Sequence, residues 1–174
     1  MLTQEQLKHF LHYDPLTGVF IWRERTPAMF NDTKQRSAQH RCAVWNARYA
    51  HKVAGRLSMG YIGISINDKK YQAQCLAWLY MMGEWPSHIV DHKNRKKDQN
   101  NWDNLRAATK SQNSANSTKR AKLKGVSKIR DKWRAQIKMN GVYKHLGVRD
   151  CPAAAHFLYQ IAADNFFGEY ARIS

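Results

Sequence analysis

Cysteine is scarce in this sequence, and its three cysteines, Cys42, Cys75 and Cys151, lie far apart. None belongs to a Cys-x-x-Cys pair, so the sequence indicates neither a disulfide framework nor a zinc ribbon. Long apolar runs are missing too, because no segment approaches the roughly 20 apolar residues of a membrane span. The first residues lack a charged region followed by an apolar stretch, which a secretory signal would show. We therefore expect a cytoplasmic protein with no membrane partner.

Acidic residues are few: the sequence has 13 Asp and Glu and 29 Lys and Arg, which gives a formal net charge of +16. Residues 1–90 hold 11 Lys or Arg and 6 Asp or Glu, residues 91–149 hold 17 and 4, and residues 150–174 hold 1 and 3. The positive charge is therefore concentrated in the middle of the chain. That segment is also rich in Asn, Gln and Ser, a mixture suited to phosphate contacts and base-edge readout rather than to lipid. The composition favours nucleic acid as the partner.

A short helix and a strand are predicted near the start of the chain. Thr3 and Gln6 form a possible capping box before apolar residues at helical spacing, which predicts a helix over about residues 3–12. The β-rich run at residues 19–22 predicts a strand. Residues 26–52 are polar and basic with no clear period, so we predict a long surface loop. That loop could contact the DNA backbone or be a solvated insertion.

A hairpin and an apolar helix are predicted next. Residues 60–66 and the residues from Tyr71 onward flank a turn at Asn67-Asp68, which indicates a hairpin. Residues 73–82 are apolar and are followed by Gly83, which predicts a helix ending there. Further along, residues 114–124 are rich in Ser, Asn, Lys and Arg, and we predict an exposed connector.

The last part of the chain predicts a three-stranded antiparallel sheet packed on one helix. Strand-like runs cover residues 125–130, 133–138 and 142–147, with turns at Asp131-Lys132 and Asn140-Gly141. Apolar residues at helical spacing predict a helix over residues 151–167; they are Ala154, Ala155, Leu158, Ile161, Ala162 and Phe166. Strand alternation directs Ala135 and Ile137 toward the helix, and it leaves a basic free face that could enter the major groove. That face holds Arg134, Gln136, Lys138, Tyr143 and His145.

An acid, a histidine and spaced asparagines occur within the most basic part of the chain. Asp91 and His92 are adjacent, Asn104 follows after eleven residues, and Asn113 follows after eight more. Phosphodiester cleavage needs a metal to neutralise the scissile phosphate and a base to deprotonate water. An Asp-His pair followed by a further oxygen ligand supplies both. A lone Asp-His dipeptide is more often a capped turn, but the spaced asparagines favour a nuclease site.

The Val-Asp-His run, the two asparagines and the Asn-Leu-Arg106 run resemble the phage-type His-Asn-His (HNH) homing endonucleases. The Tyr-Asp-Pro-Leu-Thr-Gly18 opening also resembles this group. The resemblance implies a ββα-metal site in which Asp91 and Asn113 bind the metal, His92 is the general base and Asn104 braces the loop. Oxygen ligands suit one divalent ion, Mg²⁺ or Mn²⁺, whereas zinc would prefer Cys and additional His. A phage-encoded enzyme would act in the host cell cytoplasm.

Two departures from the family pattern suggest an alternative. Relatives commonly carry a His-Arg pair where this chain has Gln74-Cys75, and Asn-Gly where it has Asn94-Arg95. If the missing His or Arg helps to position phosphate, the chain could be a non-catalytic sequence-specific DNA-binding protein with a decayed nuclease module. A third alternative is an RNA-binding protein.

Residues from about 121 to the end resemble the plant ethylene-response-factor type of DNA-binding domain. The resemblance rests on Lys-Gly-Val-Ser-Lys, Trp-Arg-Ala-Gln-Ile, His-Leu-Gly and a Gly168-Glu-Tyr run. It implies that Val126, Ile137, Leu146 and Phe157 are core residues. Trp133 could stack on a sugar or pack against the protein. The DNA contacts implied by this resemblance are Lys128, Arg130, Arg134, Gln136, Lys138, Tyr143 and His145.

Together these observations predict an α+β protein that acts on double-stranded DNA, as a monomer, with a metal-dependent endonuclease activity of homing or site-selective nicking type. Residues 1–113 would form the HNH nuclease domain, with its core motif at 88–113. Residues 114–124 would be a basic linker, and residues 125–174 the ethylene-response-factor-like domain. Further DNA contacts are predicted at cations that a solvated charged surface could also explain. These cations are Lys93, Arg95, Lys96, Lys97, Arg106, Lys119 and Arg120.

Overall fold

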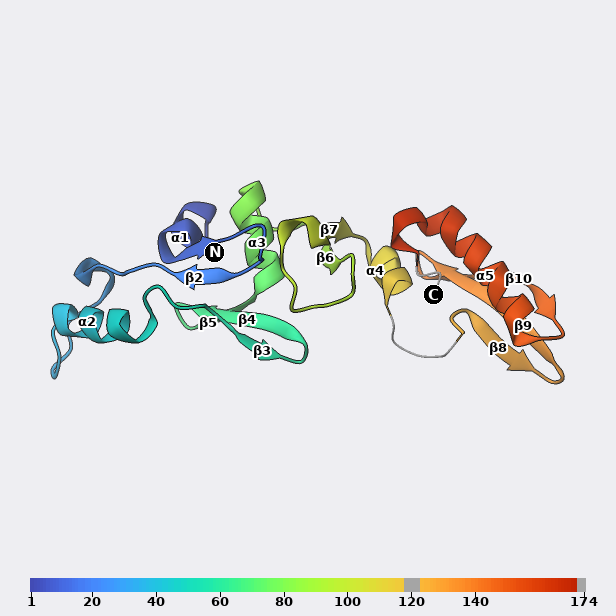
Figure 1. The fold of residues 1–174 in the computed structure, drawn as a ribbon, viewed down its shortest axis with the longest axis horizontal. Coiled ribbons are helices and arrows are strands. Elements are labelled where there is room, and N and C mark those ends of the chain that lie inside the picture. The colour runs from blue at the N-terminus through green and yellow to red at the C-terminus, as the bar shows by residue number, and fades with distance from the viewer. Residues whose placement is uncertain (118–122, 172–174) are drawn as a thin grey trace. The chain divides into compact units, whose positions relative to one another are not determined.

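A computed structural model describes residues 1–117 and 123–171, and it combines helices and short antiparallel sheets, so the predicted α+β class is confirmed (Figure 1). The chain divides into two compact units, Met1–Arg106 and Ala107–Ser174. Within the described residues, no helix is both long enough and apolar enough to cross a membrane.

The N-terminal unit begins with the predicted helix and strand. Helix α1 spans Gln4–Phe10, and its N-cap Thr3 forms a capping box with Gln6, as predicted. The helix ends two residues earlier than expected because the chain becomes extended at Leu11 and forms β1, Leu11–Tyr13. Strand β1 pairs antiparallel with β2, Phe20–Trp22.

The hairpin and the apolar helix also lie where they were predicted. Strands β3 (Arg56–Ser58), β4 (Tyr61–Ile66) and β5 (Lys69–Gln72) form an antiparallel sheet, and Asn67 and Asp68 have φ of 48° and 61° in the β4–β5 turn. Helix α3 (Ala73–Met82) ends at Gly83, whose φ is 84°. Ile64, Ile66, Leu76 and Leu79 are almost completely buried, and they form part of this unit's core.

The predicted loop over residues 26–52 is wrong, because it contains the 3₁₀ turn η1 (Pro27–Met29) and the twelve-residue helix α2, Ala38–Tyr49. Polar contacts with the Arg25 backbone hold helix α2 in place. Such contacts cannot be predicted from the spacing of apolar residues. Asn46 Nδ2 donates to the carbonyl of Arg25 at 2.8 Å, and the Arg25 amide donates to Asn46 Oδ1 at 2.9 Å. Cys42, the buried residue of this helix, donates from Sγ to the same carbonyl at 3.0 Å.

The N-terminal unit ends with the strand that carries the Asp-His pair. Strand β6 spans Ile89–His92, and the 3₁₀ turn η2 (Trp102–Asn104) leads directly into β7, Leu105–Ala108. Strands β6 and β7 form a two-stranded sheet, so the segment between them is a long loop closed at its base by a β ladder.

The C-terminal unit starts with a short helix, α4, at Lys110–Asn116, whose N-cap Thr109 forms a capping box with Gln112. The predicted connector from residue 114 therefore begins inside a helix, and Ala115 and Asn116 are buried. Lys124 donates from Nζ to carbonyl groups of the last turn of α4, a favourable position for a cation at a helix C-terminus.

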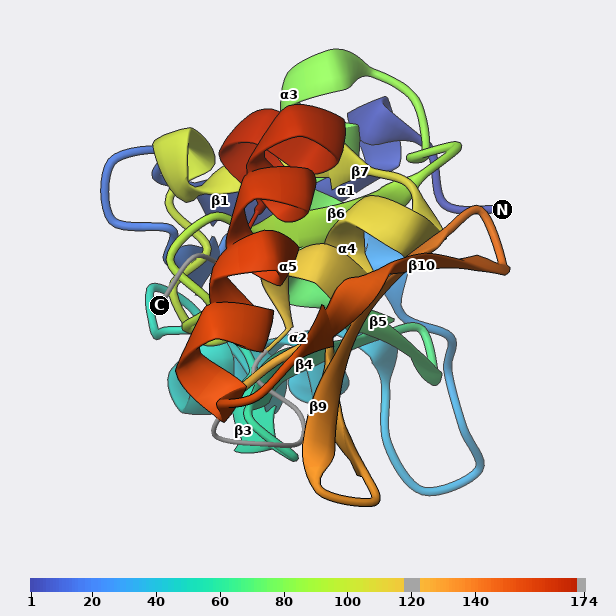
Figure 2. The ribbon, with the colours of Figure 1, turned by 90° about the vertical axis from the view of Figure 1, so that its right-hand side faces the viewer.

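A sheet covered by the helix α5 completes this unit, and Figure 2 shows α5 beside β9 and β10. The strands β8 (Val126–Ile129), β9 (Lys132–Met139) and β10 (Val142–Arg149) are antiparallel in the order β10-β9-β8, and α5 (Pro152–Phe167) packs on them before a 3₁₀ turn, η3, at Gly168–Tyr170. The Asn140-Gly141 turn is confirmed, with φ of 47° and 90°. The first turn lies at Arg130-Asp131, one residue earlier than predicted, because Lys132 already pairs with Ile129.

The residues of α5 that face the core differ in part from those that were predicted. Ile137 packs with Tyr159, Ala162 and Ala163 of α5, and Leu146 is partly buried against them. Phe157, predicted as core, is 61% exposed, and Ile161 and Phe166 are also exposed. Since the helix turns 100° per residue, the buried row Ala155, Tyr159, Ala162 and Ala163 leaves these three apolar residues outside the contact face.

Candidate active site

Asp91 and His92 are both buried at the end of β6, with relative exposures of 6% and 4%. Arg106 on β7 is also buried, and its Nε lies 3.1 Å from Asp91 Oδ2. Burial of a carboxylate is unfavourable unless the carboxylate is paired, and Arg106 supplies the partner of Asp91. The β6–β7 ladder thereby holds an anionic oxygen donor beside a histidine.

His92 has a defined orientation because Asn100 lies against its ring, with His92 Nε2 at 3.1 Å from Asn100 Oδ1. Asn100 Nδ2 donates to the carbonyl of Asp98 at 3.2 Å, which leaves the amide oxygen facing the imidazole. The oxygen can only accept, so Nε2 carries the hydrogen and Nδ1 carries the lone pair. The ring is therefore arranged to take up a proton at Nδ1.

Burial lowers the pKa of the His92 imidazole below its usual value, although the hydrogen bond to Asn100 and the charge of Asp91 oppose this shift. Desolvation disfavours the imidazolium cation, which is why burial acts in this direction. A lowered pKa keeps His92 neutral near pH 7, and only a neutral imidazole can act as a general base.

Asn104 lies at the base of the loop and contacts both of its arms. Its Oδ1 accepts from the Asn94 amide at 3.0 Å, and its Nδ2 donates to the Gln99 carbonyl at 2.7 Å. Its own carbonyl accepts from the Lys93 amide at 2.8 Å. These contacts are the geometry that a loop-bracing residue requires.

Asn100 and Tyr13, which were not predicted as site residues, hold the His92 ring in place: Asn100 contacts the ring, and Tyr13 contacts Asn100. Tyr13 donates from its hydroxyl to the Asn100 carbonyl at 2.6 Å, and Asn100 is only 2% exposed. The turn after Tyr13 also approaches this segment, since the Trp102 amide donates to the Pro15 carbonyl at 2.8 Å. Gly18 lies so close that a Cβ there would be 2.2 Å from the Asn101 nitrogen. Asn100 could have been noticed as an asparagine inside the motif, whereas nothing local in the sequence links Tyr13 to it.

The predicted phosphate-binding cations of the loop differ in their surroundings. Lys93, Arg95 and Lys96 are exposed, and Lys97 is half-buried with Nζ 4.5 Å from the centre of the Tyr61 ring. Arg106 is buried beside Asp91, so its guanidinium already has an anionic partner within the protein. A direct DNA contact by Arg106 remains a prediction.

The atoms that the two candidate metal ligands can donate decide which metal fits them. Asp91 offers carboxylate oxygens, and Mg²⁺ is often held by one or two carboxylates together with substrate phosphates. Asn113 lies on α4 in the C-terminal unit, half-buried, and its role as the second ligand remains a prediction. Among the described residues, no cluster of three or more His, Cys, Asp or Glu side chains could hold a metal. These donors fit a divalent ion that prefers oxygen ligands, with its remaining ligands supplied by the substrate, better than they fit zinc.

The predicted DNA contacts of the sheet fall into two groups. Lys138 pairs with Tyr143 and Gln136 with His145, so these four side chains share a face, with Arg134 on the same side of β9. Lys128 pairs instead with Trp133 and belongs to the other face, and Arg130 lies in the turn with φ of 52°. Lys119 and Arg120 lie outside the described residues.

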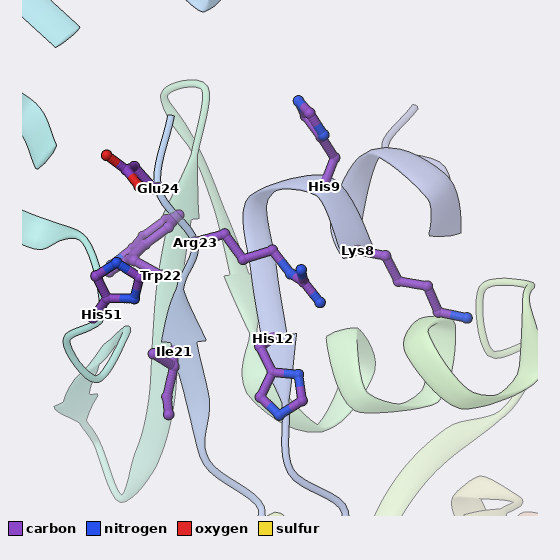
Figure 3. Close-up of a pocket in the computed structure, with 8 residues that line it drawn as sticks. All are labelled: Lys8, His9, His12, Ile21, Trp22, Arg23, Glu24 and His51. Atoms are coloured by element: carbon purple, nitrogen blue, oxygen red, sulfur yellow. The ribbon is translucent and has the colours of Figure 1, made fainter. Parts of the chain in front are cut away.

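A hollow of about 610 Å³ in the N-terminal unit is lined by three histidines, and it was considered as a metal site. Figure 3 shows that the rings do not converge: Arg23 extends between His9 and His12, and His51 lies beside Trp22 and Glu24. This agrees with the lack of a metal-holding cluster among the described residues.

The part of the chain that contains Asp91 and His92 resembles known nucleases. Residues 71–115 match the HNH endonuclease family. A protein of Acanthamoeba polyphaga mimivirus that is named an HNH endonuclease is 36% identical over 95 residues, which cover 53% of this chain and 51% of that relative. The chain thus spans about half the length of this relative. No solved structure matches the chain. Residues 71–115 are thus similar to an HNH endonuclease domain, and this similarity supports a nuclease enzyme.

Proposed function

We propose that the protein is a metal-dependent DNA endonuclease, of the site-selective nicking or homing type, that hydrolyses phosphodiester bonds. The observation that carries the proposal is the buried Asp91-His92 pair, with Arg106 holding the acid and Asn100 holding the base. This pair lies inside the segment that matches the HNH endonuclease family. The net charge of +16 supports DNA as the substrate.

In the proposed mechanism His92 takes a proton from water at Nδ1, and Asn100 keeps Nε2 protonated so that the ring presents the correct nitrogen. Asp91 and Asn113 would hold the divalent ion, Mg²⁺ or Mn²⁺, which when bound neutralises the scissile phosphate and stabilises the leaving oxygen. Asn104 keeps the loop closed behind the base, and exposed Lys93, Arg95 and Lys96 position the DNA backbone.

The test is cleavage of supercoiled plasmid and of long phage DNA with Mg²⁺ or Mn²⁺, beside a chelator control. We expect discrete products that the chelator abolishes. His92→Ala should lower the cleavage rate by about 10²–10⁴-fold and leave DNA binding intact, because it removes only the general base. His88→Ala is the matched control, since His88 is exposed four residues earlier. Equal cleavage by His92→Ala and the unmodified chain would exclude the proposed base.

The alternative is a DNA-binding protein without catalytic activity, and it is motivated by Gln74. This side chain is 3% exposed, and its Oε1 has no hydrogen-bond partner within the described residues. A buried orphan acceptor is unfavourable, as expected where a residue has replaced one that the fold prefers. This alternative predicts salt-sensitive binding of DNA, with intact DNA at every metal concentration.

A further inference from the structure

A second hollow in the N-terminal unit has a chemistry that the nuclease site does not use. It has a volume of about 600 Å³, within the range of small-molecule sites. Four cationic side chains line it, and no acidic side chain does. These are Arg25, Lys52, Arg56 and Lys70. In residues 1–117 and 123–171, none of the four forms an ion pair.

One wall of the hollow is the outer face of the β3-β4-β5 sheet. Ile64 and Ile66 point into the core, so the alternate residues Gly63 and Ser65 face the hollow. Ser65 pairs with Lys70 across the strands. The Lys70 side chain lies over Gly63, because a Cβ on this glycine would be 2.6 Å from Lys70 Cε. Gly63 therefore lets the Lys70 cation lie across this face of the sheet.

The hollow is also lined by aromatic side chains from β2 and α2. Trp22 and Trp45 meet edge to face, with ring centres 5.5 Å apart, and Tyr49 lies 5.3 Å from Trp45 and is 37% exposed. Arg25 stacks on Trp45, with its guanidinium carbon 3.9 Å from the ring centre. Tyr49 lines the same positively charged hollow, and the guanidinium carbon of Arg48 lies 5.3 Å from its ring centre. The ring is therefore partly accessible and has a further cation beside it.

The charge of Arg25 is poorly compensated. Arg25 Nε is buried and has no hydrogen-bond partner within the described residues. Burial among the rings lowers the pKa of Arg25, because the cation has lost water and gained no acidic partner. An anion held by the other three cations would lie in the same hollow as Arg25 and would add negative charge near it.

From this geometry we propose that the hollow binds one nucleotide of a DNA strand, with the phosphate held by Lys52, Arg56 and Lys70 and the base stacked on Tyr49. Cations that follow the backbone beside an aromatic platform are the combination by which proteins hold single-stranded nucleic acid. The site would anchor a strand at a second point, and it does not depend on His92. A failure of cleavage and a failure of this site are therefore separate results.

The experiment uses the full chain with His92→Ala, so that DNA stays intact. Binding of a single-stranded oligothymidylate is measured, with thymidine monophosphate, thymidine and inorganic phosphate as competitors. We expect the monophosphate to compete best of the three. Tyr49→Leu should weaken oligonucleotide binding about tenfold, because stacking contributes about 1–3 kcal/mol per base. Tyr49→Phe should restore it.

Lys69 provides a matched control for the phosphate contact. Lys69 and Lys70 are adjacent on β5 and point to opposite faces, and only Lys70 lines the hollow. We expect Lys70→Gln to weaken binding several-fold more than Lys69→Gln. Photocrosslinking of an oligonucleotide that carries 5-iododeoxyuridine should label the peptide containing Tyr49.

Equal effects of the two lysine changes, or crosslinks confined to other peptides, would overturn the proposal. Competition by inorganic phosphate equal to that by the monophosphate would also overturn it, since a site for phosphate alone needs no base platform. Circular dichroism of each variant shows whether the fold is retained.

Discussion

Polar residues are used differently in the two compact units. In the N-terminal unit, six polar or charged residues are buried, and five of them lie on or beside the loop after β6. Asp91 pairs with Arg106, His92 contacts Asn100, and Asn104 bonds to the loop backbone. Among the polar and charged side chains in the described part of the C-terminal unit, only Asn116 is buried. The predicted DNA contacts on the sheet are exposed or half-buried. Buried polar networks fix geometry, whereas exposed cations give affinity that salt can screen. The buried residues of the first unit therefore fix the positions of side chains, whereas the exposed cations of the second unit would supply the salt-sensitive attraction to DNA that we propose.

The sharpest test of this contrast compares two ion pairs. Arg106→Ala leaves the buried Asp91 carboxylate without its cation, and we expect the free energy of unfolding to fall by about 3–5 kcal/mol. Lys132→Ala breaks the pair between Lys132 Nζ and Asp150 at 3.3 Å, whose side chains are 64% and 89% exposed. That change should cost less than about 1 kcal/mol. Denaturant unfolding measures both, and similar losses would contradict the contrast.

A second test compares two glycines that both have positive φ. Gly18 has φ of +76°, and a Cβ there would meet backbone atoms of Asn100 and Asn101 within 2.3 Å. Gly141 has φ of +90° and nothing within 4 Å of the added atom. Gly141→Ala should cost only the left-handed conformation, about 1–2 kcal/mol.

Gly18→Ala must also displace the loop that holds Asn100, so we expect about 2–4 kcal/mol in unfolding experiments and reduced cleavage as well. If the two glycine substitutions destabilised the protein equally, the turn at residues 14–18 would not be a support for the active site.

The two units also differ in how much of their structure could be predicted from the sequence. The sheet of the C-terminal unit follows from strand alternation and an Asn-Gly turn, which are local signals, and its strands lie within a few residues of the predicted ranges. The helix face was predicted less well, because in an alanine-rich helix the apolar residues do not form a single stripe. Phe157 shows this, as it is apolar and yet 61% exposed.

In the N-terminal unit the motif identified Asp91, His92 and Asn104, but not the residues that hold them. Asn100 faces His92 only because the loop folds back, and Tyr13 reaches Asn100 across 87 positions of the chain. Arg106 was predicted to contact DNA because cations beside such motifs often do so, and the structure places it against Asp91. Helix α2 was overlooked because Asn46 and Cys42 attach it through the Arg25 backbone. Long-range contacts of this kind leave no local pattern.

Tyr13 allows a pH test of the buried cluster. Burial raises the pKa of the Tyr13 hydroxyl above its usual value, with further contributions from the charges of Asp14 and Asp103. Above pH ~10 the unfolded chain loses this proton while the folded chain keeps it, so stability should fall as the pH rises. Tyr13→Phe should cost about 1 kcal/mol at pH 7 through the lost hydrogen bond, and it should flatten the alkaline decline. An unchanged alkaline slope would contradict burial of this hydroxyl.

The smallest effects are expected on the exposed face of the C-terminal sheet. Arg134→Gln and Lys138→Gln should each reduce the slope of log affinity against log salt by about 1, because we propose that each of these cations holds one phosphate. Lys144→Gln is the matched control: Lys144 lies on the next strand, pairs with Ile137 on the helix side, and has Nζ 5.2 Å from the Phe166 ring centre. Cleavage at saturating DNA should be unchanged in all three variants, since none touches the Asp-His cluster. If Lys144→Gln lowered the slope as much as Lys138→Gln, the charge of the unit as a whole, and not one face of its sheet, would hold the DNA.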